Sequence, residues 1–260
     1  MSRIITALSV ITLTLLLAAC GKVDADHDQD HIVNQTLNTV LTHPERPHAD
    51  HSRDKRRKPA EVMEFFALEP GMDVLEILAG GGYYTEILSR VVGNNGSVVM
   101  QNNKKYYDFQ SDRAVSQRLN NQRLPNVQRW DKELNALGLS PNQFDAAFFM
   151  LVFHDLYWMT NDVERVVLDI FSSIKPGGIV GIVDHAAPEG SGADAARDLN
   201  GTHRIEEAHV IEVFEKAGFV LEQTSELLRN GQDDRTQAFF SETLKNKPTD
   251  RFVLKFRKPA

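Results

Sequence analysis

The chain has 260 residues, of which 42% are hydrophobic and 25% are charged, and its formal net charge at pH 7 is −7. This composition excludes a disordered or collagen-like chain, and the length fits one large domain. The acidic balance argues against a general nucleic-acid binder, so we expect no nucleic-acid partner. The only tight basic run, Lys55–Lys58, is interpreted as a solvated helix start. The single cysteine excludes an internal disulfide and a cysteine metal cluster.

The first twenty residues have the layout of a signal peptide. Arg3 precedes an uncharged apolar run over residues 4–19, which is short for a membrane span. The run ends in Leu-Ala-Ala followed by Cys20, which resembles the bacterial lipobox. That resemblance implies cleavage after residues 1–19 and a lipid on Cys20 that holds the chain to a membrane. Gly21 follows in place of an aspartate, so we expect the periplasmic face of the outer membrane in a bacterial envelope. An uncleaved anchor with an incidental cysteine is the alternative.

The residues that follow are interpreted as a tether and a helical extension. Residues 20–30 are polar and acidic, as in a short flexible tether. Residues 31–70 are predicted to form an N-terminal helical extension, including one helix from about Ser52 to Ala67. The apolar side chains of that helix are expected to pack on the main domain; they are Val62, Met63, Phe65 and Phe66.

From residue 71 to residue 260, short β-rich runs alternate with helical stretches, which is typical of an α/β fold with a parallel sheet. The predicted strands are Asp73–Leu78, Ser97–Gln101, Val127–Trp130, Phe144–Leu151, Gly178–Asp184, Phe219–Leu227 and Arg251–Arg257. The predicted helices between them are Tyr83–Val92, Ser111–Asn121, Asp162–Ile174 and Ile205–Ala217. The segment Lys175–Gly178 is expected to break the chain between the helix before it and the fifth strand.

A glycine turn follows the first predicted strand. It comprises Gly80, Gly81 and Gly82 and leads into a predicted helix that begins at Tyr83. Glycines at such a turn let the backbone bend tightly and approach a ligand closely. Glu76 lies near the carboxyl end of the strand, where its carboxylate can accept hydrogen bonds from the amino or hydroxyl groups of a ligand.

This pattern resembles the first motif of the class I S-adenosylmethionine-dependent methyltransferases, with Glu76, Gly80 and Gly82 at the matching positions. The resemblance covers roughly residues 57–260 and implies a Rossmann-like fold. In that fold a mostly parallel seven-stranded sheet carries an antiparallel C-terminal strand, and S-adenosylmethionine is the cofactor. Further segments that match the family are Phe144–Phe149, Ile174–Gly178 and Lys216–Phe219. The chain also resembles, more narrowly, a subgroup of exported methyltransferases. The segments that carry this second resemblance are Gly80–Glu86, Asp184-His185, His203–Ile205 and Asp250–Phe256.

The chain departs from the family pattern near the expected cofactor site. Leu78 stands where the family usually has another glycine, and the second strand ends in Gln101 and Asn102 in place of an acid that binds the ribose. Amides lack the charge that strengthens such hydrogen bonds, so we expect weaker cofactor binding, or none. The resemblance also implies cofactor contacts from Tyr83 and from Asp131, at the position that contacts adenine; an ordinary surface acid is the alternative for Asp131.

Polar residues follow the fourth and fifth predicted strands, where ligands bind in an open parallel sheet. We predict that His154 or His185 removes a proton from the methyl acceptor and that Asp155 orients an imidazole or a substrate amine. The predicted catalytic residues are therefore His154, Asp155 and His185. The predicted substrate-binding residues are Asp184, His203, Arg204 and Tyr157.

Each of these residues has a structural alternative. A histidine near a strand end can be a simple hydrogen-bond partner, and Arg204 can pair with Glu206 or Glu207. The loop of residues 188–193 is a candidate lid over the site. Sequence spacing does not force a metal site, and we expect no bound metal; the ligands of such a site would come from His154, Asp155, Asp184, His185 and His203.

We therefore predict a lipid-anchored, periplasm-facing methyltransferase that transfers a methyl group from S-adenosylmethionine to a small molecule. Because this cofactor is made in the cytoplasm, the alternative is a catalytically degenerate protein of the same fold that binds another ligand or maintains the envelope. A nicotinamide oxidoreductase fits less well, because the glycine turn lacks the G-x-G-x-x-G pattern and the second strand ends in amides.

Overall fold

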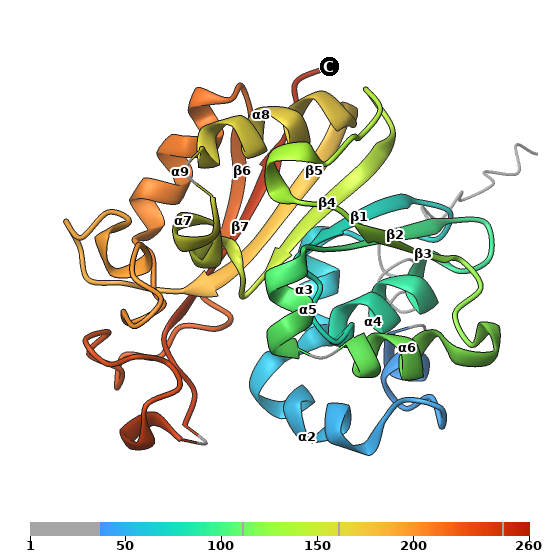
Figure 1. Ribbon diagram of the computed structural model, residues 1–260, viewed down its shortest axis with the longest axis horizontal. Coiled ribbons are helices and arrows are strands. Elements are labelled where there is room, and N and C mark those ends of the chain that lie inside the picture. Colours follow the sequence, from blue (N-terminus) through green and yellow to red (C-terminus); the bar gives the residue numbers. More distant parts are fainter. Residues whose placement is uncertain (1–36, 111, 161, 246) are drawn as a thin grey trace, which may run out of the picture.

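The computed structural model describes residues 37–260 apart from residues 111, 161 and 246. Cys20, the predicted signal peptide and the tether lie outside these residues. A seven-stranded sheet of order β3-β2-β1-β4-β5-β7-β6 forms the centre of the described part (Figure 1). Its strands are β1 (Asp73–Ile77), β2 (Ser97–Asn102), β3 (Val127–Asp131), β4 (Phe144–Met150), β5 (Ile174–His185), β6 (Val220–Ser225) and β7 (Arg251–Arg257).

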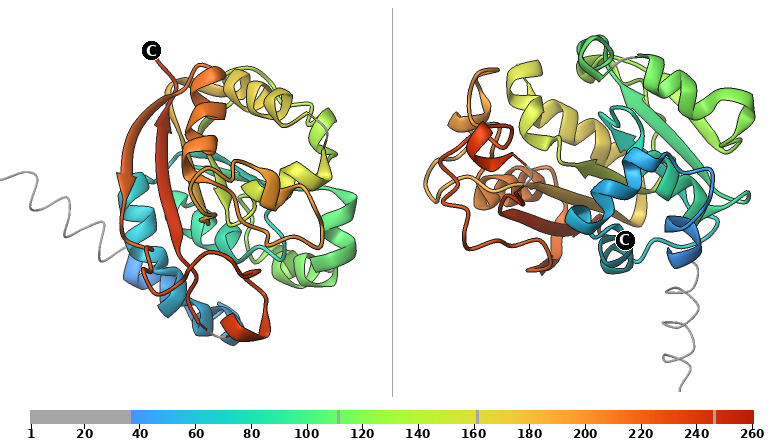
Figure 2. Two further views of the ribbon diagram at one scale, coloured as in Figure 1. Left: turned by 90° about the vertical axis from the view of Figure 1, so that its left-hand side faces the viewer. Right: turned by 90° about the horizontal axis from the view of Figure 1, so that it is seen from below.

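The pairing of the strands confirms the predicted fold class. Strands β1 to β5 pair with one another in parallel, whereas β7 runs antiparallel to both β5 and β6. Figure 2 (left) shows β6 and β7 side by side at one edge of the sheet. The α-helices are α2 (His48–Arg57), α3 (Pro59–Phe66), α4 (Tyr83–Val92), α5 (Lys104–Gln110), α6 (Asp112–Leu119), α7 (Leu156–Met159), α8 (Val163–Ser173) and α9 (Glu207–Lys216).

Helices cover both faces of the sheet because the strands are apolar on both sides. Leu75 and Leu254 face a buried cluster that includes residues of α8 and α9. Their chain neighbours Val74 and Val253 point to the opposite face and join a cluster with α3 and α4. Because the parallel strands run in the same direction, their carboxyl ends lie at one edge of the sheet, between these two helix layers. The turns that follow the strands can build a site at this edge, which we call the rim.

The N-terminal extension differs from the prediction in one respect. The predicted helix Ser52–Ala67 is two helices, because Lys58 has left-handed backbone dihedrals with φ 42° and Pro59 begins α3. A proline ring suits the first turn of a helix but interrupts a continuing one. The basic run therefore lies at the end of α2 and not at a helix start. Val62 and Phe66 are fully buried, which confirms that this segment packs on the main domain.

Other boundaries agree closely, with three differences. Strand β7 and helix α4 have the predicted bounds, whereas α5 and α7 were not predicted. Strand β5 begins at Ile174, so the expected break at Lys175–Gly178 belongs to the strand, and its pairing with β4 shifts register there. Among the described residues, no helix combines the length and the apolar character needed to cross a membrane.

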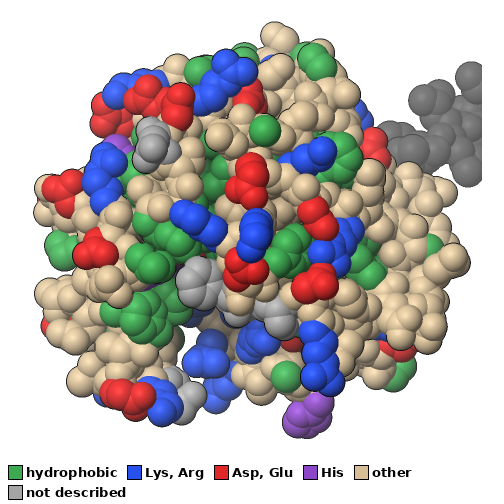
Figure 3. Space-filling view, in the orientation of Figure 1, with side chains coloured by type: hydrophobic (Ala, Val, Ile, Leu, Met, Phe, Trp, Pro, Cys, Tyr) green, Lys and Arg blue, Asp and Glu red, His purple; other side chains and the backbone are tan. Residues whose placement is uncertain are grey.

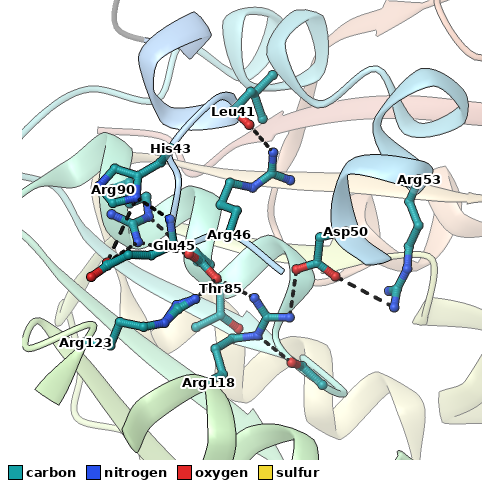
Figure 4. Close-up of polar contacts among 12 residues, drawn as sticks. Leu41, His43, Glu45, Arg46, Asp50, Arg53, Thr85, Arg90, Arg118 and Arg123 are labelled. Carbon is teal, nitrogen blue, oxygen red and sulfur yellow. Dashed lines mark hydrogen bonds and ion pairs between the residues drawn. The ribbon is translucent and has the colours of Figure 1, made fainter. Parts of the chain in front are cut away.

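Ion pairs tie α2 to the sheet layer (Figure 4). Arg118 of α6 donates from Nη2 to Asp50 Oδ2 of α2 at 2.8 Å and from Nη1 to Glu86 Oε2 of α4 at 2.5 Å. Its Nε donates to the carbonyl oxygen of Gly81 at 2.7 Å. One buried guanidinium therefore holds α2, α4 and the glycine turn together.

Candidate functional site

A cavity of about 570 Å³ lies at the carboxyl ends of β1, β4 and β5. Figure 3 shows a hollow in the lower part of the molecule that is bordered by Lys and Arg side chains. Residues of β1 and the glycine turn form one wall, and residues of α2 and of the segments 239–245 and 247–249 border the opening. The predicted site residues that line this cavity are Glu76, Gly80, Tyr83, Asp155, His185 and His203.

The amides at the end of β2 brace the glycine turn. Gln101 accepts a hydrogen bond from Leu78 N at 3.0 Å and donates one to the carbonyl of Lys132 at 2.7 Å. Asn102 accepts from Gly80 N at 2.8 Å and donates to the Gly80 carbonyl at 3.1 Å. Both side chains are fully buried and neither lines the cavity. This corrects the expectation that they meet a ribose, which would first require breaking these bonds.

The backbone of the turn explains two of its residues. Leu78 has φ 50°, so the position where the family usually has glycine keeps the left-handed backbone that glycine favours. Gly82 has φ 80°, and a Cβ there would lie 2.7 Å from Arg118 Cδ. Gly82 is therefore needed for packing against Arg118 and does not line the cavity, whereas Gly80 does.

Glu76 is a buried acid in the cavity wall. Its side chain comes from β1, and its Oε2 accepts a hydrogen bond from the Thr85 hydroxyl at 2.5 Å. Burial raises the pKa of Glu76 from 4.5 to about 8, against the smaller opposing effects of Thr85 and Arg118. A buried carboxyl group with a raised pKa in a cleft is a typical feature of a binding or catalytic site. Glu76 can accept hydrogen bonds from a ligand once it ionises.

His154 lies behind the cavity wall and is not suited to act as a base. Its Nδ1 lies 2.7 Å from Asp184 Oδ1, and its backbone N–H donates to Asp184 Oδ2 at 2.8 Å. Burial alone would lower the pKa of His154, but the charges of Asp184 and Asp155 outweigh burial and raise it to about 10. A protonated ring cannot accept the proton of a methyl acceptor. His154 and Asp184 thus pair with each other, and neither of these two predicted residues lines the cavity.

Asp155 receives several donors at the edge of the cavity. Tyr106 donates from its hydroxyl to Oδ2 at 3.0 Å, and Trp158 donates from Nε1 to Oδ1 at 2.9 Å. His203 Nδ1 lies 3.2 Å from the same Oδ1. Burial opposes ionisation, but His154 and these donors hold the pKa of Asp155 well below its usual value. Asp155 is therefore a carboxylate that orients its neighbours.

His185 is the histidine whose surroundings favour the neutral ring at the cavity. Its Nδ1 lies 2.7 Å from Thr249 Oγ1, and its ring stacks on Phe239 with centroids 4.4 Å apart. Burial, followed by the charge of His154, lowers the pKa of His185 well below 6.5. A neutral imidazole has one nitrogen lone pair and can accept a proton. Because the ring of His185 lines the cavity and that of His154 does not, His185 is the better placed of the two to contact a ligand.

Three other predicted residues have partners elsewhere. Arg204 is fully buried and donates from Nη2 to Asp233 Oδ2 at 2.9 Å, so its guanidinium pairs with Asp233 in place of Glu206 or Glu207 and does not line the cavity. Tyr157 points to α9, where its hydroxyl lies 2.8 Å from His209 Nε2. Asp131 is held by Arg129 Nε at 2.8 Å and by the hydroxyl of Tyr107, outside the cavity lining.

Several lining residues were not predicted. Phe239 and Phe240 cover the cavity, whereas the expected lid of residues 188–193 is held away by Glu206, which accepts from Gly190 N and Gly192 N. The basic run Lys55–Lys58 was a partial signal, because two of its arginines line the opening. Among the described residues, six lining side chains are cationic: Arg53, Arg56, Arg57, Lys245, Lys247 and Arg251.

Comparisons with known proteins place this cavity in a familiar fold. Residues 51–129 match a family model described as protein-L-isoaspartate(D-aspartate) O-methyltransferase. A sequence search of curated proteins returned no match. A methyltransferase from Aquifex aeolicus, described as S-adenosylmethionine-dependent, is structurally similar with a TM-score of 0.59 and 20% identity over 86% of this chain and 97% of that one.

Two further solved structures are similar. The [4+2]-cyclase SpnF has a TM-score of 0.59 and 19% identity over 90% of this chain and 95% of its own. An arsenic(III) S-adenosylmethionine methyltransferase from Chlamydomonas reinhardtii has a TM-score of 0.54 and 17% identity over 86% of this chain and 73% of its own. The chain therefore has the α/β fold of the class I S-adenosylmethionine-dependent methyltransferases.

Proposed function

We propose that this protein is an S-adenosylmethionine-dependent methyltransferase that acts on an anionic small molecule. The observation that carries the proposal is the cavity itself, which joins Glu76 and the glycine turn at the ligand-binding rim of this fold. The family-model match over residues 51–129 spans the same turn. A volume of about 570 Å³ is in the usual range for a small-molecule site.

The residues of the cavity fit the cofactor in part. Glu76 can bind an amino group, and Gly80 and Gly81 leave room for close approach beside it. When bound, S-adenosylmethionine supplies an electrophilic methyl group. On the acceptor side, His185 lines the same cavity and can take up the proton that an O–H or N–H acceptor loses. Asp155 and Tyr106 fix the opposite part of the wall through their mutual hydrogen bond.

The charge of the lining supports an anionic methyl acceptor. Six Lys or Arg side chains line the cavity, against the two acids Glu76 and Asp155. Arg251 is 5% exposed, and its Nε has no hydrogen-bond partner among the described residues. A buried guanidinium with an unused donor suits a carboxylate or phosphate group.

A specific observation favours a second candidate, a methyltransferase-fold protein that has lost the activity and binds another ligand in the envelope. Gln101 and Asn102 hydrogen-bond the glycine turn, and neither side chain lines the cavity where a ribose would lie. The similar structure of the [4+2]-cyclase SpnF supports the view that this fold also serves other chemistry.

For either candidate we propose a location outside the cytoplasm, with a lipid on Cys20 holding the chain to the outer membrane. This proposal rests on the lipobox-like sequence alone. Cys20→Ser should abolish incorporation of labelled fatty acid and release the protein from membranes. Unchanged membrane association without label incorporation would instead support the uncleaved anchor.

Calorimetric titration with S-adenosylmethionine and S-adenosylhomocysteine tests the proposed cofactor. The wild type should bind both, and Glu76→Ala should weaken binding about 10- to 100-fold because a charge-assisted hydrogen bond is lost. Asp131→Asn is the matched control, since Asp131 lies outside the cavity lining, and its affinity should not change. Absence of heat and of a thermal shift at millimolar ligand would reject the methyltransferase and favour the second candidate.

The acceptor class is tested by methyl transfer to paired anionic and neutral acceptors of similar shape. The anionic member of each pair should react faster, and the Lys245→Gln, Lys247→Gln double variant should reduce that preference. Both lysines are exposed, so their replacement leaves the fold intact. Lys216→Gln, on α9 and outside the lining, is the control. Equal rates for anionic and neutral acceptors would contradict the proposed substrate class.

A further inference from the structure

We propose that His154, Asp155 and His203 form a binding site for a divalent first-row transition metal ion at the wall of the cavity. A metal was not expected from the sequence, because nothing in the spacing brings residue 203 to residues 154 and 155. The fold brings one ligand atom of each within 4.8 Å of the others. The proposal concerns metal binding and does not depend on the proposed methyl transfer.

The distances between the donor atoms fit a common ion. Asp155 Oδ1 lies 3.2 Å from His154 Nε2 and 3.2 Å from His203 Nδ1. Zinc binds imidazole nitrogen and carboxylate oxygen at about 2.1 Å, so two such ligands at tetrahedral or octahedral angles lie roughly 3.0–3.4 Å apart. Two imidazoles and one carboxylate are a donor set for Zn²⁺, Fe²⁺ or Co²⁺.

The hydrogen bonds of the outer ring nitrogens orient both histidines for such a site. His154 Nδ1 lies 2.7 Å from Asp184 Oδ1, and His203 Nε2 lies 2.7 Å from the carbonyl oxygen of Leu199. Metal-binding histidines usually donate their second ring N–H to a carboxylate or carbonyl, which fixes the lone pair on the other nitrogen toward the metal. Both histidines here have that arrangement, with Nε2 of one and Nδ1 of the other directed to Asp155. An ion bound here would displace the proton that His154 Nε2 carries in the metal-free protein.

Two further features point to a ligand. His154 Nε2 is buried and, among the described residues, has no hydrogen-bond partner, because its approach to Asp155 lacks hydrogen-bond geometry. His203 has φ 52°, a left-handed backbone that costs about 1–2 kcal/mol in a residue with a side chain. Strained backbone of this kind is concentrated at functional sites. Asp155 and His203 both line the cavity, so coordination positions not filled by protein face it.

The test is titration of the metal-stripped full chain with Co²⁺, followed by its visible d–d absorption, and then displacement by Zn²⁺. We expect one equivalent to bind, with affinity reduced at least about 100-fold in His203→Ala and about 10- to 100-fold in Asp184→Asn, which removes the outer partner of His154. His209→Ala is the matched control, because this half-buried histidine bonds Tyr157 outside the cavity lining, and binding should be unchanged.

A second measurement on the wild type keeps the proposal testable if a variant fails to fold. X-ray absorption of the zinc-loaded protein should show two imidazole ligands and oxygen donors at about 2.1 Å. Absence of stoichiometric Co²⁺ binding would overturn the proposal. Binding that survives in folded His203→Ala but is lost in His51→Ala, on the exposed face of α2, would also overturn it, since the ion would then lie elsewhere.

Discussion

Replacing Arg118 by methionine should destabilise the protein strongly, because this side chain joins three elements around the glycine turn. Asp50 is 2% exposed and Arg118 is 9% exposed, so their 2.8 Å ion pair is buried. In Arg118→Met, Glu86 keeps Arg90 at 3.0 Å, but among the residues that the structure describes Asp50 keeps only Arg53 as an ion-pair partner, 3.8 Å away. A buried carboxylate without a close partner costs about 3–5 kcal/mol, and the loss should fall in that range.

A double-mutant cycle separates the stranded charge from the lost packing. Asp50→Asn alone should cost about 1–3 kcal/mol, since Arg118 keeps its bonds to Glu86 and the Gly81 carbonyl. The double variant should be less destabilised than the sum of the single variants by at least about 1 kcal/mol. Urea denaturation measures all three free energies of unfolding, with the exposed Arg165→Met as control. A loss of less than about 1 kcal/mol of unfolding free energy in Arg118→Met, or additive effects of the two single variants, would show that Asp50 is not left as an unpaired buried charge.

Three further changes have distinct expected outcomes. Burial raises the pKa of Glu76 from 4.5 to about 8, so the folded protein keeps a proton that the unfolded chain releases. The free energy of unfolding of the wild type, relative to that of Glu76→Gln, should therefore fall by up to about 5 kcal/mol as pH rises from 4.5 to about 8. Urea denaturation at each pH measures this difference, and a difference that does not change with pH would contradict the prediction. Arg204→Met should lower the free energy of unfolding by about 3–5 kcal/mol, because Asp233 loses its buried partner. A folded variant with normal stability but weaker substrate binding would instead support a substrate contact for Arg204. Gly82→Ala should lower the melting temperature more than Gly71→Ala. Both glycines have positive φ, but a Cβ at Gly82 would clash with Arg118, whereas a Cβ at Gly71 would meet no atom within 4 Å. Equal decreases in melting temperature would show that the Arg118 side chain can move aside.

The sequence predicts the central strands well because β1, β2 and β4 carry apolar runs that two helix layers bury. The bounds of β7 agree to the residue, since the polar residues that flank its apolar side chains are a local feature. The break at Lys58 was missed even though Pro59 follows it, because residues 52–58 are all polar and give no apolar periodicity by which a helix boundary could be placed. Helix α7 is a single turn, too short to produce a periodic signal.

The site could be predicted only as far as the rim of the sheet. The positions of strand ends indicate which residues reach the rim, but not which way each side chain turns. Asp184 turns to His154, and Arg204 turns to Asp233, which is 29 residues away in the sequence. The segments 239–245 and 247–249, which line the cavity, carry no sequence motif that would have pointed to a site. Burial and pairing among distant residues therefore decide which candidates face a ligand.

The most direct test of the proposed cofactor site is a crystal structure of the protein with S-adenosylhomocysteine. We expect S-adenosylhomocysteine to lie in the cavity at the carboxyl ends of β1 and β4. Its amino group should be within hydrogen-bond distance of Glu76, and its amino-acid part should lie against Gly80. We also expect that Gln101 and Asn102 keep their hydrogen bonds to the turn. Ligand bound away from Glu76, or a different molecule retained in the cavity at saturating S-adenosylhomocysteine, would contradict the account.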